Sequence, residues 1–411
     1  MSTTEKFVAT IGATRRGGNQ LGIKQYNERL ILSLIRQAGA LTKADIARIT
    51  HLTPQTITTI VNRLLKEGYL RKKAVIRGRI GQPSTPVEIA PDGAISVGMK
   101  IGRRSMDLVA LSLNGRVVAK NSTAYEHLDA SVVLDLVEPC FDRLKRELSE
   151  AQLSRLVGVG IAAPTALERG IPVIGDPGGD KPRLREAELV ARVEEVSSLS
   201  TMVLNDATAA CLAEMDKAHE HREGSTIYFY LSTLVGGSIV INGSLITGRT
   251  GNAGAVGAIP IELASHVMKG KPCQFIEVAS LNRLEAIAAR NHVPPQCFRE
   301  DGGSPSAIDQ KVLACFDEWC DLAADALAFA SISGTSFIEA QNVVVDGVIL
   351  RPLLDRLISR IKGCMDNYKL EGITPPEVRA GTIGFDARSI GAALLPLQDQ
   401  FAPDNRVVLK S

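Results

Sequence analysis

Aromatic residues are scarce in this sequence of 411 residues: Phe, Trp and Tyr make up 4%, and there is one Trp. This scarcity argues against a surface on which the bases of single-stranded nucleic acid would stack. An uninterrupted apolar run of about 18 residues, as a membrane-spanning helix needs, is missing too. The closest stretch, residues 225–242, is broken by Ser, Thr and Gly and fits two strands better. The N-terminus lacks the pattern of a secretory signal, so we expect a cytoplasmic protein without membrane contact.

Paired cysteine motifs are also missing. The seven cysteines are an odd number and include no Cys-x-x-Cys pair, which predicts reduced, buried thiols. The 36 Gly and 19 Pro residues are an ordinary content, which excludes collagen-like and fully disordered chains. A chain of this length predicts two or three domains.

Charge is distributed unevenly although the net charge is only +2. Residues 1–90 hold 15 Lys and Arg against 5 Asp and Glu, whereas the remainder holds 32 basic and 40 acidic residues. This split favours a nucleic-acid-binding head on a body with another task, over a basic tail without a specific partner. We therefore divide the chain into a flexible basic arm (1–19), a DNA-binding domain (20–90) and a body (91–411).

The basic head has the pattern of a winged helix-turn-helix. A first helix is predicted from Tyr26 to Gln37. A second begins after Thr42 as N-cap and is expected to bury Ile46, Ala47 and Ile49. Thr53 and Pro54 then supply an N-cap and a first helical residue for a third helix.

The third helix has the pattern of a recognition helix. Ile57, Ile60, Val61 and Leu64 recur at helical spacing and predict one buried stripe. The opposite face carries amides, hydroxyls and basic groups but no carboxylate, which suits the major groove of DNA. Strands at 70–75 and 87–89 around a basic loop predict a wing that enters a minor groove. The predicted DNA contacts are Lys43, Thr53, Gln55, Thr56, Thr58, Thr59, Asn62, Arg63, Lys66, Arg77 and Arg79. A protein-docking module is the alternative, and the local charge favours DNA.

The body has a repeated α/β pattern. Apolar strands lead to an Asn114-Gly115 turn, followed by a predicted helix over 129–150 and a buried strand over 156–162. The strand pattern recurs later around Asn242-Gly243, which suggests two lobes of like fold. Spacing alone does not distinguish such lobes from an unrelated pair of α/β domains.

The body and head together resemble the ROK family of repressors and sugar kinases. The resemblance rests on residues 27–70, VGVGIAAPT (157–165), VLNDATAACLAE (203–214), GSLITGRTGNAGAVGAI (243–259), NVVVDGVI (342–349) and GTIGFDARSIGAALL (381–395). It implies an α/β fold, with a winged helix-turn-helix before a two-lobed, actin-like (duplicated RNase H-like) body. Within this family, repressor members generally carry the N-terminal module and kinase members lack it.

The residues that match the family's phosphate turns have changed. Family kinases place Asp-x-Gly-Gly-Thr after the first strand, where this chain has Lys100-Ile101-Gly102-Arg103-Arg104. The second turn, Leu-Gly-Thr-Gly-Ile-Gly in the family, is Leu231-Ser232-Thr233-Leu234-Val235-Gly236 here. Phosphoryl transfer needs backbone amides close to the phosphates and a carboxylate near the metal. We therefore expect no enzymatic activity, no catalytic residue and no cofactor.

The sugar side of the family pattern is partly kept. Asn205-Asp206 matches the family's Asn-Asp pair, whose Asp bonds a sugar hydroxyl in repressors, although Asp206 also fits a helix cap. The family's Gly-Glu-x-Gly-His has lost its Glu and His to Ala255 and Ala258. The predicted ligand-binding residues are Thr165, Asn205, Asp206 and Asn252, of which the first and last also fit ordinary turns. The family's zinc cluster is reduced to His266 and Cys273, so we expect no metal.

These observations favour a ligand-responsive transcriptional regulator, most simply a repressor of carbohydrate genes. Its expected partners are double-stranded DNA with an inverted-repeat operator and a small carbohydrate or derivative. A homodimer or a dimer of dimers is expected, because two-fold symmetry gives such heads specificity. The alternatives are an ATP-dependent sugar kinase with an added head, and a regulator whose body is only a dimerisation scaffold.

Overall fold

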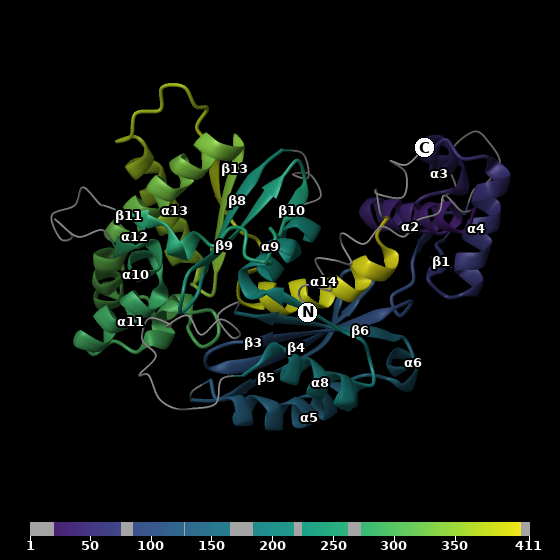
Figure 1. Ribbon diagram of the computed structural model, residues 1–411, viewed down its shortest axis with the longest axis horizontal. Helices are drawn as coiled ribbons and strands as arrows, with labels where there is room; N and C mark the ends of the chain where they lie inside the picture. Colours follow the sequence, from purple (N-terminus) through teal and green to yellow (C-terminus); the bar gives the residue numbers. More distant parts are fainter. Residues whose placement is uncertain are drawn as a thin grey trace. The chain divides into compact units, whose positions relative to one another are not determined.

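The computed structural model describes residues 20–74, 85–126, 128–164, 184–217, 224–261 and 273–403 (Figure 1). The chain forms two units. Unit 1 contains Met1–Ile161, Arg185–Val203 and Ala392–Ser411, and unit 2 contains Ala162–Leu184 and Leu204–Gly391. Among the described residues, no helix has both the length and the apolar composition needed to cross a bilayer. The predicted arm, residues 1–19, lies outside the described residues.

The head belongs to unit 1 and is a winged helix-turn-helix, as predicted. The Thr42 hydroxyl accepts a hydrogen bond from the Asp45 amide, and the Thr53 hydroxyl accepts one from the Thr56 amide, so both predicted N-caps are confirmed. Strands β1 and β2 pair antiparallel, with Leu70 opposite Ile89. The elements are α2 (Gln20–Ala38), α3 (Lys43–Thr50), α4 (Pro54–Lys66), β1 (Leu70–Lys72) and β2 (Val87–Ile89).

Three details of the head differ from the sequence prediction. Helix α2 begins at Gln20 rather than Tyr26, and β1 ends at Lys72 rather than at residue 75. Ile49, predicted to be buried, is 46% exposed. The reason is that an eight-residue helix buries only a narrow stripe, centred here on Ile46, and Ile49 lies at its edge.

The first lobe, in unit 1, is a sheet of strand order β5-β4-β3-β6-β7 with α5 packed on β4 and β5. The predicted Asn114-Gly115 turn joins β4 to β5, and Gly115 has a φ of 84°. The lobe consists of β3 (Ile95–Ile101), β4 (Ser105–Ser112), β5 (Val117–Ala124), α5 (Ala130–Arg146), α6 (Glu150–Leu153), β6 (Leu156–Ala163), α8 (Glu186–Ser197) and β7 (Thr201–Asn205).

The second lobe, in unit 2, repeats this order as β10-β9-β8-β13-β14. Asn242 and Gly243 both have positive φ and form the second predicted turn. The sheet strands are β8 (Thr226–Leu231), β9 (Gly236–Ile241), β10 (Ser244–Ile246), β13 (Asn342–Gly347) and β14 (Glu377–Ala380). The matching strand orders confirm the predicted duplication.

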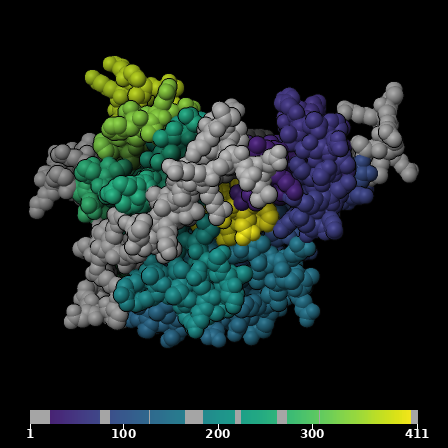
Figure 2. Space-filling view, turned by 45° about the vertical axis from the view of Figure 1, so that its right-hand side comes forward, coloured from purple at the N-terminus to yellow at the C-terminus, as the bar shows by residue number. Residues whose placement is uncertain are grey.

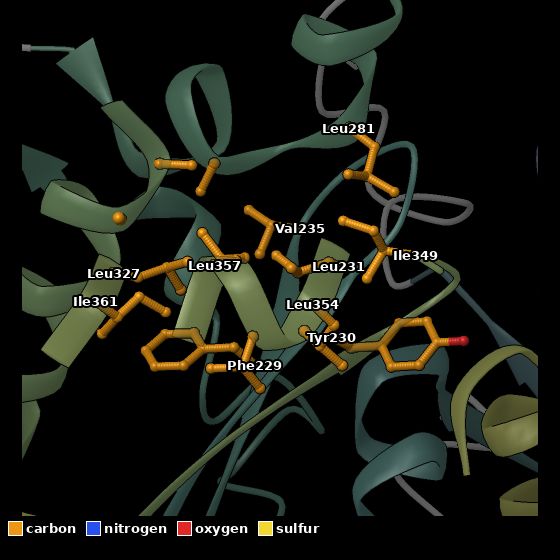
Figure 3. Close-up of a cluster of buried hydrophobic side chains, with 14 of the residues drawn as sticks. Phe229, Tyr230, Leu231, Val235, Leu281, Leu327, Ile349, Leu354, Leu357 and Ile361 are labelled. Carbon is orange, nitrogen blue, oxygen red and sulfur yellow. The ribbon is translucent and has the colours of Figure 1, made fainter. Parts of the chain in front are cut away.

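Helices cover the sheet of unit 2 and enclose its core. Phe229, Tyr230 and Leu231 of β8 lie in this core beside side chains of α12 and α13 (Figure 3). The remaining elements of the unit are α9 (Asp206–Lys217), η2 (Val256–Ala258), β11 (Pro260–Ile261), β12 (Cys273–Gln274), α10 (Phe275–Ala279), α11 (Leu281–Arg290), η4 (Pro295–Phe298), η5 (Pro305–Ala307), α12 (Gln310–Ile338), α13 (Arg351–Met365) and η6 (Gly384–Asp386).

Helix α14 (Ala387–Phe401) begins in unit 2 and ends in unit 1. Two glycines allow its backbone to approach its neighbours closely. A Cβ added at Gly391 would lie 1.7 Å from the Ala209 carbonyl oxygen of α9, and one added at Gly160 of β6 would lie 1.8 Å from the Ala392 carbonyl oxygen. Any side chain at either glycine would therefore force backbones apart.

Replacing Gly160 tests this packing. We expect Gly160→Ala to lower the free energy of unfolding by about 3 kcal/mol, the upper range for overpacking, because the obstructing atom is a backbone carbonyl oxygen. The matched control is Gly363→Ala in α13, where a Cβ meets nothing within 4 Å; alanine there is expected to stabilise by about 0.5–1 kcal/mol. Urea unfolding followed by circular dichroism compares the two, and an unchanged midpoint for Gly160→Ala would contradict the close approach.

Candidate nucleic-acid interface and ligand site

Helix α4 presents one apolar and one polar face. Ile57, Ile60, Val61 and Leu64 are at most 5% exposed and fix the helix in the head. The other face is exposed along most of its length and carries Gln55, Thr58, Thr59, Asn62 and Lys66. No Asp or Glu occurs between Pro54 and Lys66, so no carboxylate of α4 would repel DNA phosphates from this face. The head is the violet part of the surface in Figure 2.

Hydrogen bonds orient several of the predicted contact residues. The Lys43 ammonium donates to Asn62 Oδ1 over 2.9 Å, which links the start of α3 to the exposed face of α4. The Thr59 hydroxyl donates to the Gln55 carbonyl oxygen over 3.0 Å. Thr53 and Thr56 bond to one another at 2.9 Å at the beginning of α4. Gln55 is the second residue of α4 and so belongs to its first turn, where backbone amides favour a phosphate.

Arg63 is placed differently from the other predicted contacts. Its guanidinium forms an ion pair with the mostly buried Glu28 of α2 and lies 3.6 Å from Glu67. Both partners belong to the head, so this side chain links α4 to α2. Arg77 and Arg79, predicted for the wing, lie outside the described residues.

Further basic side chains near this face were not singled out from the sequence. The Arg48 side chain is 77% exposed although its guanidinium donates to Asp45 over 3.0 Å, and Lys72 of β1 is also exposed. Arg71 and then Lys73 hold the pKa of Glu88 below its usual range through hydrogen bonds to its carboxylate. The local excess of basic residues in the sequence could have indicated these side chains. Only the structure shows which of them form ion pairs with carboxylates of the head.

The kept Asn-Asp pair stands where β7 passes into α9. Asn205 Oδ1 accepts hydrogen bonds from the amides of Ala207 (3.0 Å) and Thr208 (3.2 Å), so Asn205 caps the helix. Asp206 Oδ1 also accepts from the Ala207 amide, at 2.9 Å. Its Oδ2 lies 3.4 Å from Arg388 Nη1. The Asp206 side chain remains 20% exposed, so it can accept a hydrogen bond from a ligand hydroxyl while the capping bonds persist.

Arg388 is held tightly beside this carboxylate. The residue is 6% exposed, and its guanidinium carbon lies 5.0 Å from the centre of the Tyr230 ring. The Tyr230 hydroxyl in turn donates to the Gly384 carbonyl oxygen over 3.1 Å. Sequence reasoning missed Arg388, because its only signal was a basic residue in a motif that also contains Asp386 and Ser389. Asn252 lies half-buried in the loop after β10, and Thr165 lies outside the described residues.

The first altered phosphate turn is filled by its own lysine. Lys100 is 5% exposed, and its ammonium lies 2.6 Å from Asp107 Oδ2 and 2.8 Å from the Ser105 hydroxyl. The Ser122 hydroxyl donates to the other carboxylate oxygen of Asp107. A Cβ at Gly102 would lie 2.6 Å from Lys100 Nζ, so the lysine occupies the space inside the turn. The charge of Lys100 is neutralised within the turn rather than offered to a phosphate.

The second altered turn uses its backbone groups internally. The Val235 amide donates to the Ser280 hydroxyl over 2.9 Å, and the Ser232 hydroxyl donates to the Leu234 carbonyl oxygen over 2.6 Å. The Leu281 and Asn282 amides donate to the carbonyl oxygens of the same turn. An amide that already has a buried hydroxyl partner is not available to cradle a phosphate.

The remnant of the family's zinc cluster is incomplete in the described part of the chain. There the Cys273 thiol donates to the Ile261 carbonyl oxygen over 3.7 Å, and no three His, Cys, Asp or Glu side chains gather as metal ligands. His266 lies outside the described residues. That the protein needs no metal remains a prediction.

A winged helix-turn-helix joined to a body of two α/β lobes with the same strand order defines the class of protein. The chain belongs to the ROK family, which it matches over residues 96–399, and residues 24–71 match the winged helix-turn-helix DNA-binding family. The resemblance stated from the sequence is therefore confirmed.

Known relatives include both regulators and kinases. The chain is 22% identical to the xylose repressor of Bacillus subtilis, over 59% of this chain and 62% of that repressor. It is 26% identical to the glucokinase of Halalkalibacterium halodurans, over 74% of this chain and 95% of that enzyme. The crystal structure of a ROK family transcriptional regulator, a homologue of E. coli Mlc, shares the fold with a TM-score of 0.66 and 20% identity, covering 95% of this chain and 99% of that one.

The buried pair at the first turn gives a testable consequence. We expect Asp107→Asn to lower the free energy of unfolding by about 3 kcal/mol, because the buried Lys100 ammonium loses its counter-charge. The control is Asp321→Asn, whose partner Arg360 is 56% exposed and whose loss costs about 0–1 kcal/mol. Urea denaturation measures both; equal effects would show that Lys100 does not depend on Asp107.

Proposed function

We propose that this protein is a DNA-binding transcriptional regulator that responds to a small carbohydrate and has no phosphoryl-transfer activity. The observation that carries the proposal is the exposed, carboxylate-free polar face of α4, fixed by four buried apolar residues. Amides on such a face suit base edges in the major groove, and hydroxyls and cations suit phosphates. The similarity to the xylose repressor adds support.

The absence of kinase activity is part of this proposal. Lys100 stands where family kinases have a carboxylate, and its ammonium is neutralised by Asp107 inside the turn. In the second turn the Val235 amide donates its hydrogen bond to the Ser280 hydroxyl. The family's carboxylate is therefore missing from the first turn, and one backbone amide of the second turn is not available to a phosphate. The similarity to a glucokinase gives the rival function, in which the body phosphorylates a sugar.

The ligand proposal centres on Asp206. Its carboxylate is partly exposed and acts as a hydrogen-bond acceptor, as recognition of a sugar hydroxyl requires. Asn205 fixes the start of the helix that bears it. Asn252 and Thr165 remain proposed as further ligand contacts. A dimer would place two copies of α4 on the half-sites of an inverted repeat.

Operator binding tests the role of α4. With DNA selected from a random library by the purified protein, we expect Gln55→Ala with Asn62→Ala to weaken binding at least about 30-fold, because each base contact contributes about 1–3 kcal/mol. Gln37→Ala, an exposed glutamine on α2, is the matched control and should leave the affinity unchanged. Fluorescence anisotropy over a salt series measures the affinities. An unchanged sequence preference in the double variant would refute the recognition-helix assignment.

Calorimetry separates the ligand proposal from the kinase. D-xylose, D-glucose and magnesium ATP are titrated into the full chain, and we expect heat from a sugar but none from the nucleotide. Asp206→Ala should weaken the sugar at least about tenfold, because a hydrogen bond to a charged group contributes about 1.5–3 kcal/mol. The control is Asp399→Ala, which replaces an exposed residue of α14 and should leave sugar binding unchanged. Stoichiometric binding of ATP would support the kinase, and sugar binding unaffected by Asp206→Ala would refute the site.

A further inference from the structure

Helix α14 contacts the Asp206 site at its first turn. Arg388, its second residue, lies 3.4 Å from Asp206 Oδ2 and over the Tyr230 ring. One turn later Gly391 meets α9, the helix that begins at Asp206, so closely that a Cβ would lie 1.7 Å from the Ala209 carbonyl oxygen. Helices α9 and α14 therefore cannot slide past one another without breaking backbone contact.

The same helix is fixed to unit 1 along its second half. The Ser96 hydroxyl of β3 donates to the Ala393 carbonyl oxygen over 2.5 Å. The side-chain amide of Gln400 donates to the Val157 carbonyl oxygen over 2.9 Å. Pro396 lacks an N–H for the helical ladder, but its ring packs on β6, where a Cβ at Gly158 would lie 2.9 Å away.

The last turn of α14 contacts the DNA-binding head. The Phe401 and Tyr69 rings meet edge to face, with centroids 5.2 Å apart, and Arg29 of α2 donates to the Ala402 carbonyl oxygen over 3.4 Å. Tyr69 lies directly after α4, and its amide donates to the Leu64 carbonyl oxygen. The ring contact is thus made with the segment that ends the proposed recognition helix.

A second contact supports the head at the same place. Arg155 of unit 1 donates to the Glu67 carbonyl oxygen over 3.0 Å, and a Cβ at Gly68 would lie 2.7 Å from its guanidinium. The end of α4 is therefore bonded to the body as well as to the rest of the head. A displacement of the last turn of α14 would act on α4 through Tyr69 while Arg155 resists it.

We propose that α14 couples the state of Asp206 to the position of α4, with Arg388 as the residue that senses the carboxylate and Phe401 as the residue that acts on the head. This inference rests on the proposed function, because it makes the Asp206 site regulatory. A sugar hydroxyl that binds Asp206 competes with Arg388 for the same carboxylate. Release of Arg388 would change the preferred position of α14. Because one end of this helix contacts α9 and the other contacts Tyr69, such a change can couple the two sites.

Hydrogen exchange tests the coupling without DNA or sugar. Asp206→Asn in the full chain removes the charge that holds Arg388 and serves as the perturbation. We expect it to change the exchange rates of amides in α4 and β1 by about 2- to 30-fold, the range for residues that modulate coupling. In the Phe401→Ala background the same substitution should change them less than about twofold, because the ring contact with Tyr69 is gone.

Matched variants separate coupling from general loosening. Phe401→Tyr keeps the ring and should preserve the response to Asp206→Asn, and Asp399→Ala, exposed on the same turn, should preserve it as well. Tyr69→Leu removes the ring from the other side of the contact and should abolish the response like Phe401→Ala, which keeps the test valid if one variant unfolds the head.

Two results would overturn the inference. One is an unchanged head in Asp206→Asn, and the other is an equal response with and without the Phe401 ring. Neither depends on operator affinity. Loss of operator selection with intact exchange coupling would instead refute the proposed function and leave the mechanical link standing.

Discussion

The close backbone packing of α14 is the constraint on which much of this molecule depends. Gly391 lets α14 approach the Ala209 carbonyl oxygen of α9, and Gly160 lets β6 approach the Ala392 carbonyl oxygen of α14, so no side chain fits at either glycine. Such contacts cannot relax by rotating a side chain, so they transmit displacement rather than absorb it. Because α9 begins at Asp206 and the far end of α14 meets Tyr69, one helix fixes the surroundings of both candidate sites.

The altered phosphate turns illustrate how the fold accommodates charged and polar groups at changed positions. Lys100 stands where family kinases have a carboxylate, and its ammonium donates to Asp107 and Ser105. The Ser122 hydroxyl donates to Asp107 in turn, so the buried charge is compensated within one lobe. At the second turn Ser280 supplies the hydroxyl that the Val235 amide requires. A buried polar group needs a hydrogen-bond partner, and for Lys100 and the Val235 amide neighbouring strands and helices provide one.

Local sequence signals predicted the elements well. N-cap threonines, Asn-Gly turns and the four-residue stripe of α4 act over a few residues, and the helices of the head, the hairpins and the recurring strand pattern followed from them. The sequence missed what depends on packing. Ile49 was assigned to the core but lies at the edge of a short helix, and the ion pair between Glu28 and Arg63, a predicted DNA contact, was not foreseen. Arg388 was overlooked, because no residue near it in the sequence indicates its contact with Asp206.

Residue type at fixed spacing was sufficient to predict the winged helix-turn-helix, the α/β body, the family and the replaced turn residues. Tertiary structure decided which of those residues meet. The contact of Arg388 with Asp206 joins residues 182 positions apart, and the bond from Arg29 to Ala402 spans 373. Partners so distant are selected by the packing of whole helices and sheets, which no local pattern of residues encodes.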